Sequence, residues 1–273
     1  MSTPIAFHVM HSLRDRRVIF KTPAEYADAY RRALRIGRRF QLGWFRIGAD
    51  HIHAVLFCSR EEVARWANSI ESSWTQAAGL GTGFATYHVK PVTDQGHLRA
   101  LIRYIFNQEA HHGAHPDPDH LGSTGPDLCG GRLVGVDAAN ITRLHLPRLR
   151  RHDIESVLLG GGAMRTLADL GPAPAGLTGE SLEGVLRSAM AAAVGRAALR
   201  TGTPNSRPLL RALLEVVERS PLSLTVELSR LLGRSPSTLR RLRARPVDPR
   251  TLAAVLWQVR FRLTRRALAD RTR

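Results

Sequence analysis

The stretch His51-Ile52-His53-Ala54-Val55-Leu56-Phe57 decides how the first half of this chain is expected to fold. Its apolar residues predict a buried strand. Side chains two residues apart on a strand point to the same face, so we expect the imidazoles of His51 and His53 to lie side by side. Such a pair can bind a divalent cation, although two histidines on a strand are also compatible with ordinary packing.

Capping signals and apolar patterns predict the elements around this strand. Thr22-Pro23-Ala24-Glu25 and Ser59-Arg60-Glu61-Glu62 have the pattern of capping boxes, which begin helices. The predicted elements are a strand over Ile5–Leu13, a helix from Thr22 to about Arg39, strands over Gln41–Ile47 and His51–Cys58, a helix from Ser59 to about Ala78, a strand near Phe84–Lys90 and a helix from Asp94 to about Glu109. This order predicts an α/β (α+β) domain with the ferredoxin-like split βαβ arrangement, whose first and third strands are central.

The last of these helices contains Tyr104-Ile105-Phe106-Asn107-Gln108. Residues four apart share a helix face, so Tyr104 and Gln108 should project together. If this helix covers the central strands, both side chains meet the two histidines. Two imidazoles and an amide oxygen can hold one cation, and a tyrosine beside it can attack a phosphate. A tyrosine in an apolar helix is also compatible with a core position.

The charge of the chain is large and unevenly distributed. The 273 residues have a formal net charge of +17. Residues 1–140 carry 16 Lys and Arg against 13 Asp and Glu, whereas residues 141–273 carry 24 Arg against 10 Asp and Glu. This segregation favours a polyanionic partner for the second half, in the first place nucleic acid. Codon bias would explain the excess of Arg over Lys but not its position in the chain.

The remaining composition excludes several classes of protein. Cys58 and Cys129 form neither a disulfide framework nor a zinc-binding pattern. The chain has no apolar stretch of the length of a membrane span and no signal-peptide pattern. We therefore expect a cytoplasmic, nucleoid-associated protein with no membrane partner.

The second half is predicted to be helical after a linker. Glycine, proline and alanine are frequent up to residue 179, and we place the domains at residues 1–136 and 180–273, with a linker at 137–179. Leucines on either side of Gly233 give the apolar skeleton of a helix-turn-helix, in which Ser235 would cap the second helix. On that helix Thr238, Arg240, Arg241 and Arg243 are candidates for DNA binding. A small helical bundle with arginines on its exposed side is the alternative.

The first half resembles a known family. Asp50-His51-Ile52-His53 before an apolar strand, and Tyr104-Ile105-Phe106-Asn107-Gln108-Glu109 before His111-His112, are similar to the motifs of the HUH single-strand endonucleases. The likeness is greatest to the single-tyrosine transposases of small insertion sequences and their REP-associated relatives, and it covers roughly residues 4–136. Phe7-His8-Val9 before Arg16-Arg17 also resembles the opening of those proteins.

This resemblance implies a mechanism and a set of site residues. Tyr104 would be the catalytic nucleophile, and His51, His53 and Gln108 would bind Mg²⁺ or Mn²⁺. The family cleaves and rejoins single-stranded DNA, often beside a small hairpin, through a 5′-phosphotyrosine intermediate, as in transposition, and commonly as a homodimer. Asp50 would either support an imidazole or be a turn residue, and we favour the turn. The arginine-rich second half departs from the minimal transposases and indicates a specialised or host-adopted enzyme.

Two other functions remain open on the sequence. One is a non-catalytic DNA-binding or hairpin-binding regulator that retains the fold. The other is a nickase of the replication-initiator or relaxase type, which would use the same chemistry at a plasmid origin.

Overall fold

The computed structural model describes residues 4–78, 83–108, 117, 119–169, 179–199, 206–219, 229 and 232–269. The chain divides into two compact units. The first comprises Met1–Cys129 and Gly135–Gly161, and the second comprises Gly130–Val134 and Gly162–Arg273. No helix in these described ranges combines the length and the hydropathy that crossing a membrane requires.

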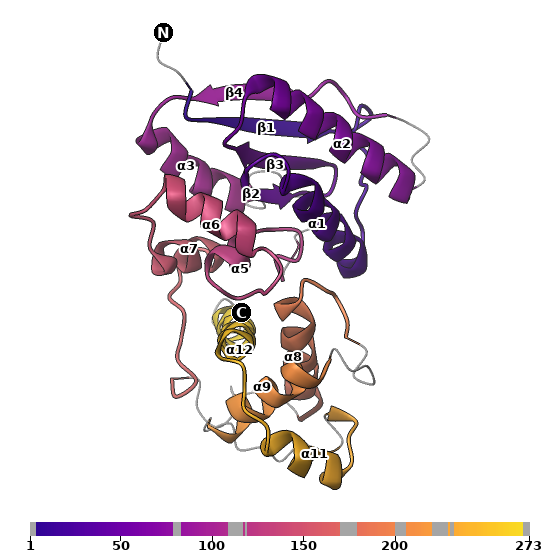
Figure 1. Cartoon of the computed structure of the whole chain (residues 1–273), viewed down its shortest axis with the longest axis vertical. Helices are drawn as coiled ribbons and strands as arrows, with labels where there is room; N and C mark the ends of the chain where they lie inside the picture. Colours follow the sequence, from indigo (N-terminus) through magenta and orange to yellow (C-terminus); the bar gives the residue numbers. More distant parts are fainter. Residues whose placement is uncertain are drawn as a thin grey trace. The chain divides into compact units, whose positions relative to one another are not determined.

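The first unit is built on a four-stranded antiparallel sheet (Figure 1). Its strands are β1 (Ala6–Ser12), β2 (Leu42–Ile47), β3 (His51–Leu56) and β4 (His88–Val92), in the order β2-β3-β1-β4. The first and third strands are therefore central, as predicted. All residues of β2 and β3 are buried, which requires that both faces of this part of the sheet are covered.

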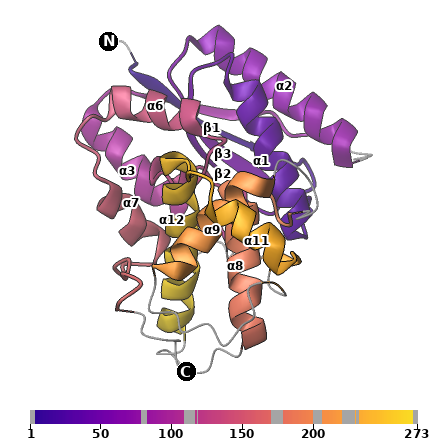
Figure 2. The same cartoon turned by 60° about the horizontal axis from the view of Figure 1, so that its bottom comes forward.

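Helices cover the two faces of the sheet. The helices α1 (Pro23–Gly37) and α2 (Arg60–Ala78) lie on one side, and α3 (Gln95–Phe106) lies on the other (Figures 1 and 2). The predicted caps are present: Thr22 and Glu25 form a complete capping box, and the Asp94 side chain accepts a hydrogen bond from the His97 amide. The mixed α+β class of this unit is thus the predicted one.

The fourth strand begins later than predicted. Phe84 forms only an isolated bridge with Leu13, whereas the continuous ladder of β4 begins where His88 pairs with Met10. These two pairings differ in register by one residue, so the ladder is interrupted between them.

The predicted linker contains two helices of the first unit. After the short helix α5 (Gly125–Leu128), the chain forms α6 (Val136–His145) and α7 (Arg151–Leu158). The segment before α5 runs beside β2, where the Ile47 amide donates to the Gly122 carbonyl at 2.9 Å and the Thr124 amide donates to the Phe45 carbonyl at 3.1 Å. Gly125–Leu128 is buried, so this segment belongs to the core of the unit.

The second unit is helical in the described residues. It contains α8 (Gly179–Ala193), α9 (Arg207–Glu218), α11 (Pro236–Arg243) and α12 (Pro249–Ala269) around one apolar core. Leu232, Leu239 and Leu242 are buried in that core. The first helix of the predicted helix-turn-helix falls mostly outside the described residues, so that motif stays a prediction.

Candidate active site

The two histidines of β3 lie next to each other, as the strand pattern predicted. His51 and His53 are both buried, and their ring centroids are 4.9 Å apart with the ring planes perpendicular. Met10 lies opposite His53 and Ser12 lies opposite His51 in the ladder with β1. Gly48 makes room for the pair, because a Cβ atom at that position would lie 2.8 Å from Cε1 of His51.

Asp50 holds the first imidazole. Its Oδ1 lies 2.5 Å from Nδ1 of His51, and Nε of Arg16 lies 3.0 Å from its Oδ2. Burial raises the pKa of the Asp50 carboxyl, but the hydrogen bond from His51 and the charge of Arg16 outweigh burial and hold this pKa below its ordinary value. Asp50 therefore occupies the bend before β3 and also orients His51, whereas we had favoured a turn role alone.

His8 on β1 completes a group of three imidazoles. Its Nε2 shares a hydrogen bond of 3.0 Å with Nδ1 of His53, and the two rings are stacked with centroids 5.2 Å apart. Burial, with smaller contributions from the positive groups of Lys90 and His97, lowers the pKa of His8 from 6.5 to about 4. The imidazole of His8 is therefore neutral at neutral pH.

Sequence reasoning did not assign His8 to the site. The available signal was its position on the first predicted strand, which neighbours the third in the split βαβ order. The register of those strands, which sets His8 diagonally across from His53, is not readable from local sequence.

Tyr104 on α3 contacts these imidazoles from the covering helix. Its ring centroid lies 5.4 Å from that of His53 and 5.8 Å from that of His8, edge to face in both pairs. Tyr104 remains 40% exposed, although its neighbour His53 is buried. The side chain of Tyr104 is therefore partly accessible from solvent beside the two imidazoles.

Gln108 lies one turn further along, beyond the C-cap residue Asn107. Its Nε2 donates to the Tyr104 carbonyl at 3.3 Å. Its Oε1 is buried and has no hydrogen-bond partner among the described residues, while the side chain is only 4% exposed. A buried carbonyl oxygen without a partner is costly, and a cation would satisfy it.

The divalent cation expected at His51, His53 and Gln108 stays a prediction, and the donor atoms of these residues limit how it could be bound. Because Nδ1 of His51 and Nδ1 of His53 are engaged by Asp50 and His8, a metal would be bound through the two Nε2 atoms. The unpartnered Oε1 of Gln108 would supply an oxygen ligand. No group of three or more His, Cys, Asp or Glu with metal-binding geometry occurs in the described residues, so the amide is essential to a three-ligand site here.

The candidates for DNA binding lie on α11, in the second unit. Thr238 is near the start of this helix, where its amide donates to Oγ of the capping Ser235 at 3.3 Å. Arg243 donates through Nε to Oε1 of Glu218 at 2.6 Å, so its charge is paired within the protein. Arg240 and Arg241 are exposed.

Comparisons with known proteins give one distant likeness. No protein-family model and no curated protein matches the chain. Among solved structures the chain is similar to a REP-associated tyrosine transposase bound to a REP hairpin, with a TM-score of 0.36 and 18% identity. That match covers 41% of this chain and 72% of the other.

Proposed function

We propose that this protein cleaves and rejoins single-stranded DNA with Tyr104 as the nucleophile, as a strand transferase of the HUH type. The observation that carries the proposal is the edge-to-face contact of Tyr104 with His53, which lies directly beside His51. This contact combines an accessible phenol, two adjacent imidazoles and, one turn on, an unpartnered amide oxygen. Such a set is suited to phosphoryl transfer through a covalent intermediate.

In the proposed first step, the phenolic oxygen of Tyr104 attacks a backbone phosphorus. A bond forms between these two atoms, and the bond from phosphorus to the 3′ oxygen breaks. The phenol proton passes to solvent, and the departing 3′ oxygen takes up a proton. The products are a 5′-phosphotyrosine and a free 3′-hydroxyl.

The second step reverses the first with the same or another 3′-hydroxyl. That hydroxyl attacks the phosphotyrosine, the phosphodiester is restored, and Tyr104 is released with its proton. The covalent bond retains the free energy of the phosphodiester, so rejoining needs no ATP. The proposed substrate is a single strand beside a small hairpin, and a homodimer is the proposed working form.

The surrounding residues would position the reacting groups. His51, His53 and Gln108 would hold Mg²⁺ or Mn²⁺, which when bound polarises a non-bridging phosphate oxygen and neutralises developing charge. Asp50 and His8 hold the imidazoles through their Nδ1 atoms. Lys90, opposite His8 on β4, adds a positive charge on the same face of the sheet, where it would attract the DNA backbone.

A covalent-capture experiment tests this proposal. The protein would be incubated with Mn²⁺ and single-stranded DNA from around its own gene, and then run on a denaturing gel. We expect a slowly migrating protein–DNA adduct with the parent protein and none with Tyr104→Phe. Tyr87→Phe is the matched control, because Tyr87 contacts His11 rather than the site and should leave the adduct unchanged.

The possible results separate the candidate functions. An adduct that persists in Tyr104→Phe would identify another nucleophile and contradict the proposal. Tight DNA binding without an adduct would instead support the non-catalytic regulator. Sequencing the captured strand would identify the cleavage site and distinguish dispersed palindromes from a plasmid origin.

The metal ligands are tested independently of cleavage. Binding of Mn²⁺ alone, measured by electron paramagnetic resonance, should weaken by at least tenfold in His51→Ala and in Gln108→Ala. Asn107→Ala removes the neighbouring amide and should bind Mn²⁺ like the parent. Equal affinities in all these proteins would remove Gln108 from the ligand set.

A further inference from the structure

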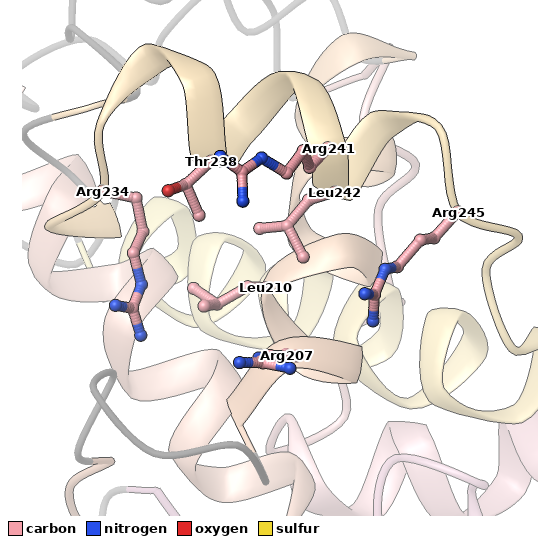
Figure 3. Close-up of a pocket in the computed structure, with 7 residues that line it drawn as sticks. All are labelled: Arg207, Leu210, Arg234, Thr238, Arg241, Leu242 and Arg245. Atoms are coloured by element: carbon pink, nitrogen blue, oxygen red, sulfur yellow. The ribbon is translucent and has the colours of Figure 1, made fainter.

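An arginine-lined pocket lies in the second unit, between α9 and α11 (Figure 3). Its volume is about 350 Å³, and it is lined by Arg207, Leu210, Arg234, Thr238, Arg241, Leu242 and Arg245. Figure 3 shows the two leucines between the arginines that surround them. The pocket thus combines four guanidinium groups with a small apolar floor and a hydroxyl.

The carboxylates nearest this pocket among the described residues are paired with arginines outside it. Glu218 accepts a hydrogen bond from Arg243 at 2.6 Å. Glu215 pairs with Arg211 at 2.6 Å and also with Arg219. None of the described residues that line the pocket is acidic, and Arg207, Arg241 and Arg245 make no ion pair with another described residue.

Guanidinium groups around one hollow repel each other, and an anion bound between them offsets this repulsion. Arginine presents planar pairs of N–H donors that match phosphate oxygens. Arg207 is also the first residue of α9, where the helix dipole adds positive potential. Both the charge and the donor geometry therefore suit a phosphate group.

We propose that this pocket is a phosphate-binding site, formed by Arg207, Arg234, Arg241 and Arg245 with Thr238. Its ligand is either a backbone phosphate of nucleic acid or the phosphate of a small phosphorylated molecule. The site adds Arg207, Arg234 and Arg245 to the contacts expected from α11. It also separates Arg241, which lines the pocket, from Arg243, which is paired with Glu218. The proposal is independent of cleavage at Tyr104.

The test uses the full chain with Tyr104→Phe as background, so that no DNA is consumed. The pocket variant is Arg207→Gln with Arg241→Gln. The control variant is Arg250→Gln with Arg266→Gln, which removes the same charge from exposed positions outside the pocket and outside α11. Binding of an unstructured single-stranded oligonucleotide would be measured by fluorescence anisotropy over a range of salt concentrations. Binding of inorganic pyrophosphate would be measured by calorimetry.

Each possible result either supports the phosphate-binding site or overturns it. If the pocket holds a DNA phosphate, the slope of log Kd against log salt falls by about 1 more in the pocket variant than in the control. If it holds a small phosphorylated molecule, these slopes agree, but pyrophosphate affinity falls at least tenfold in the pocket variant alone. If both probes bind the two variants alike, or neither probe binds the parent, the proposal is overturned.

Discussion

At the scale of single residues, His8 offers a separate test of how the site is held together. Its Nε2 lies 3.0 Å from Nδ1 of His53, and it contacts Tyr104 edge to face. Loss of a side chain that orients a metal-binding histidine typically costs about 10- to 100-fold in affinity or activity. We expect His8→Ala to lower the rate of adduct formation by about this factor and to raise the Mn²⁺ concentration for half-maximal rate.

His8→Gln distinguishes orientation from packing. A glutamine amide can replace the hydrogen bond to His53 but not the stacked ring. Recovery of the half-maximal Mn²⁺ concentration in His8→Gln would support the orienting role. A parent-like rate in His8→Ala would show that His53 needs no such support.

Cys58 is expected to be a poorly reactive thiol. Burial and the neighbouring charge of Glu62 raise its pKa from 9.0 to about 11. Only the thiolate reacts with iodoacetamide, so its fraction below pH 9 should be about a hundredfold lower than for an unperturbed cysteine. The alkylation rate, followed by mass spectrometry, should still rise at pH 10. A rate that levels off near pH 9 would contradict the raised pKa.

At the scale of secondary-structure elements, the capping box of α1 should set the stability of that helix end. Thr22 Oγ1 accepts from the Glu25 amide at 3.3 Å, and Oε2 of Glu25 accepts from the Thr22 amide at 2.9 Å. Thr22→Ala should destabilise the first turn by about 1 kcal/mol. Hydrogen exchange of the amides just after Pro23 should then be about fivefold faster, because 1.4 kcal/mol corresponds to a factor of ten. Unchanged exchange would show that packing alone holds this end.

The same box predicts an acid sensitivity. The hydrogen bond from the Lys21 amide lowers the pKa of Glu25; burial opposes this shift, and hydrogen bonds from Thr22 add to it. A carboxyl whose pKa is lower in the folded state stabilises it above the unfolded pKa, and this stabilisation is lost as the pH falls through the folded pKa. Exchange near Pro23 should therefore accelerate with acid beyond the intrinsic trend in the parent, and this excess should be absent in Glu25→Gln.

Local sequence signals predicted where helices begin better than they predicted which distant residues come into contact. Caps at Thr22, Ser59 and Asp94 placed the starts of α1, α2 and α3 correctly, because a cap is encoded within four residues. The helices α6 and α7 lie in the stretch predicted to be a linker. Both are short, and glycine and proline are frequent in the residues around them. Contacts between distant residues, such as His8 with His53, depend on strand register and were not accessible.

The candidate site followed the same division. His51 and His53 form a pair within β3, which the strand period predicted. Gln108 lies beyond the C-cap of α3, so the helix period did not fix its position relative to Tyr104. The arginine pocket joins Arg207 of α9 to Arg245 beyond α11, and no local pattern links those two positions.

At the scale of the whole molecule, Gly131 connects a distant part of the sequence to the second core. A Cβ atom at this position would lie 2.1 Å from the Trp257 ring, and the Gly131 carbonyl accepts from Nε2 of Gln258 at 2.8 Å. Gly131→Ala should therefore destabilise the second unit by about 1–3 kcal/mol through overpacking. Hydrogen exchange should accelerate in Pro249–Ala269 but not in His51–Leu56.

Gly184 provides the control. It is exposed on α8, and a Cβ atom there would meet nothing within 4 Å. Gly184→Ala should stabilise the same unit by about 0.5–1 kcal/mol, because alanine favours the helix. Equal effects of the two substitutions would contradict the packing argument.

The membership of Gly130–Val134 in the second unit has a consequence for how the protein can be divided. The chain enters that unit, returns to complete the first with α6 and α7, and then enters the second again. The Leu133 amide donates to the Ala193 carbonyl at 2.9 Å, so the segment Gly130–Val134 is hydrogen-bonded to a helix that follows it in the sequence. Cleavage of the polypeptide at one position therefore cannot separate the two units intact. A recombination event that transfers the second unit to another gene would have to transfer two separate stretches of coding sequence together.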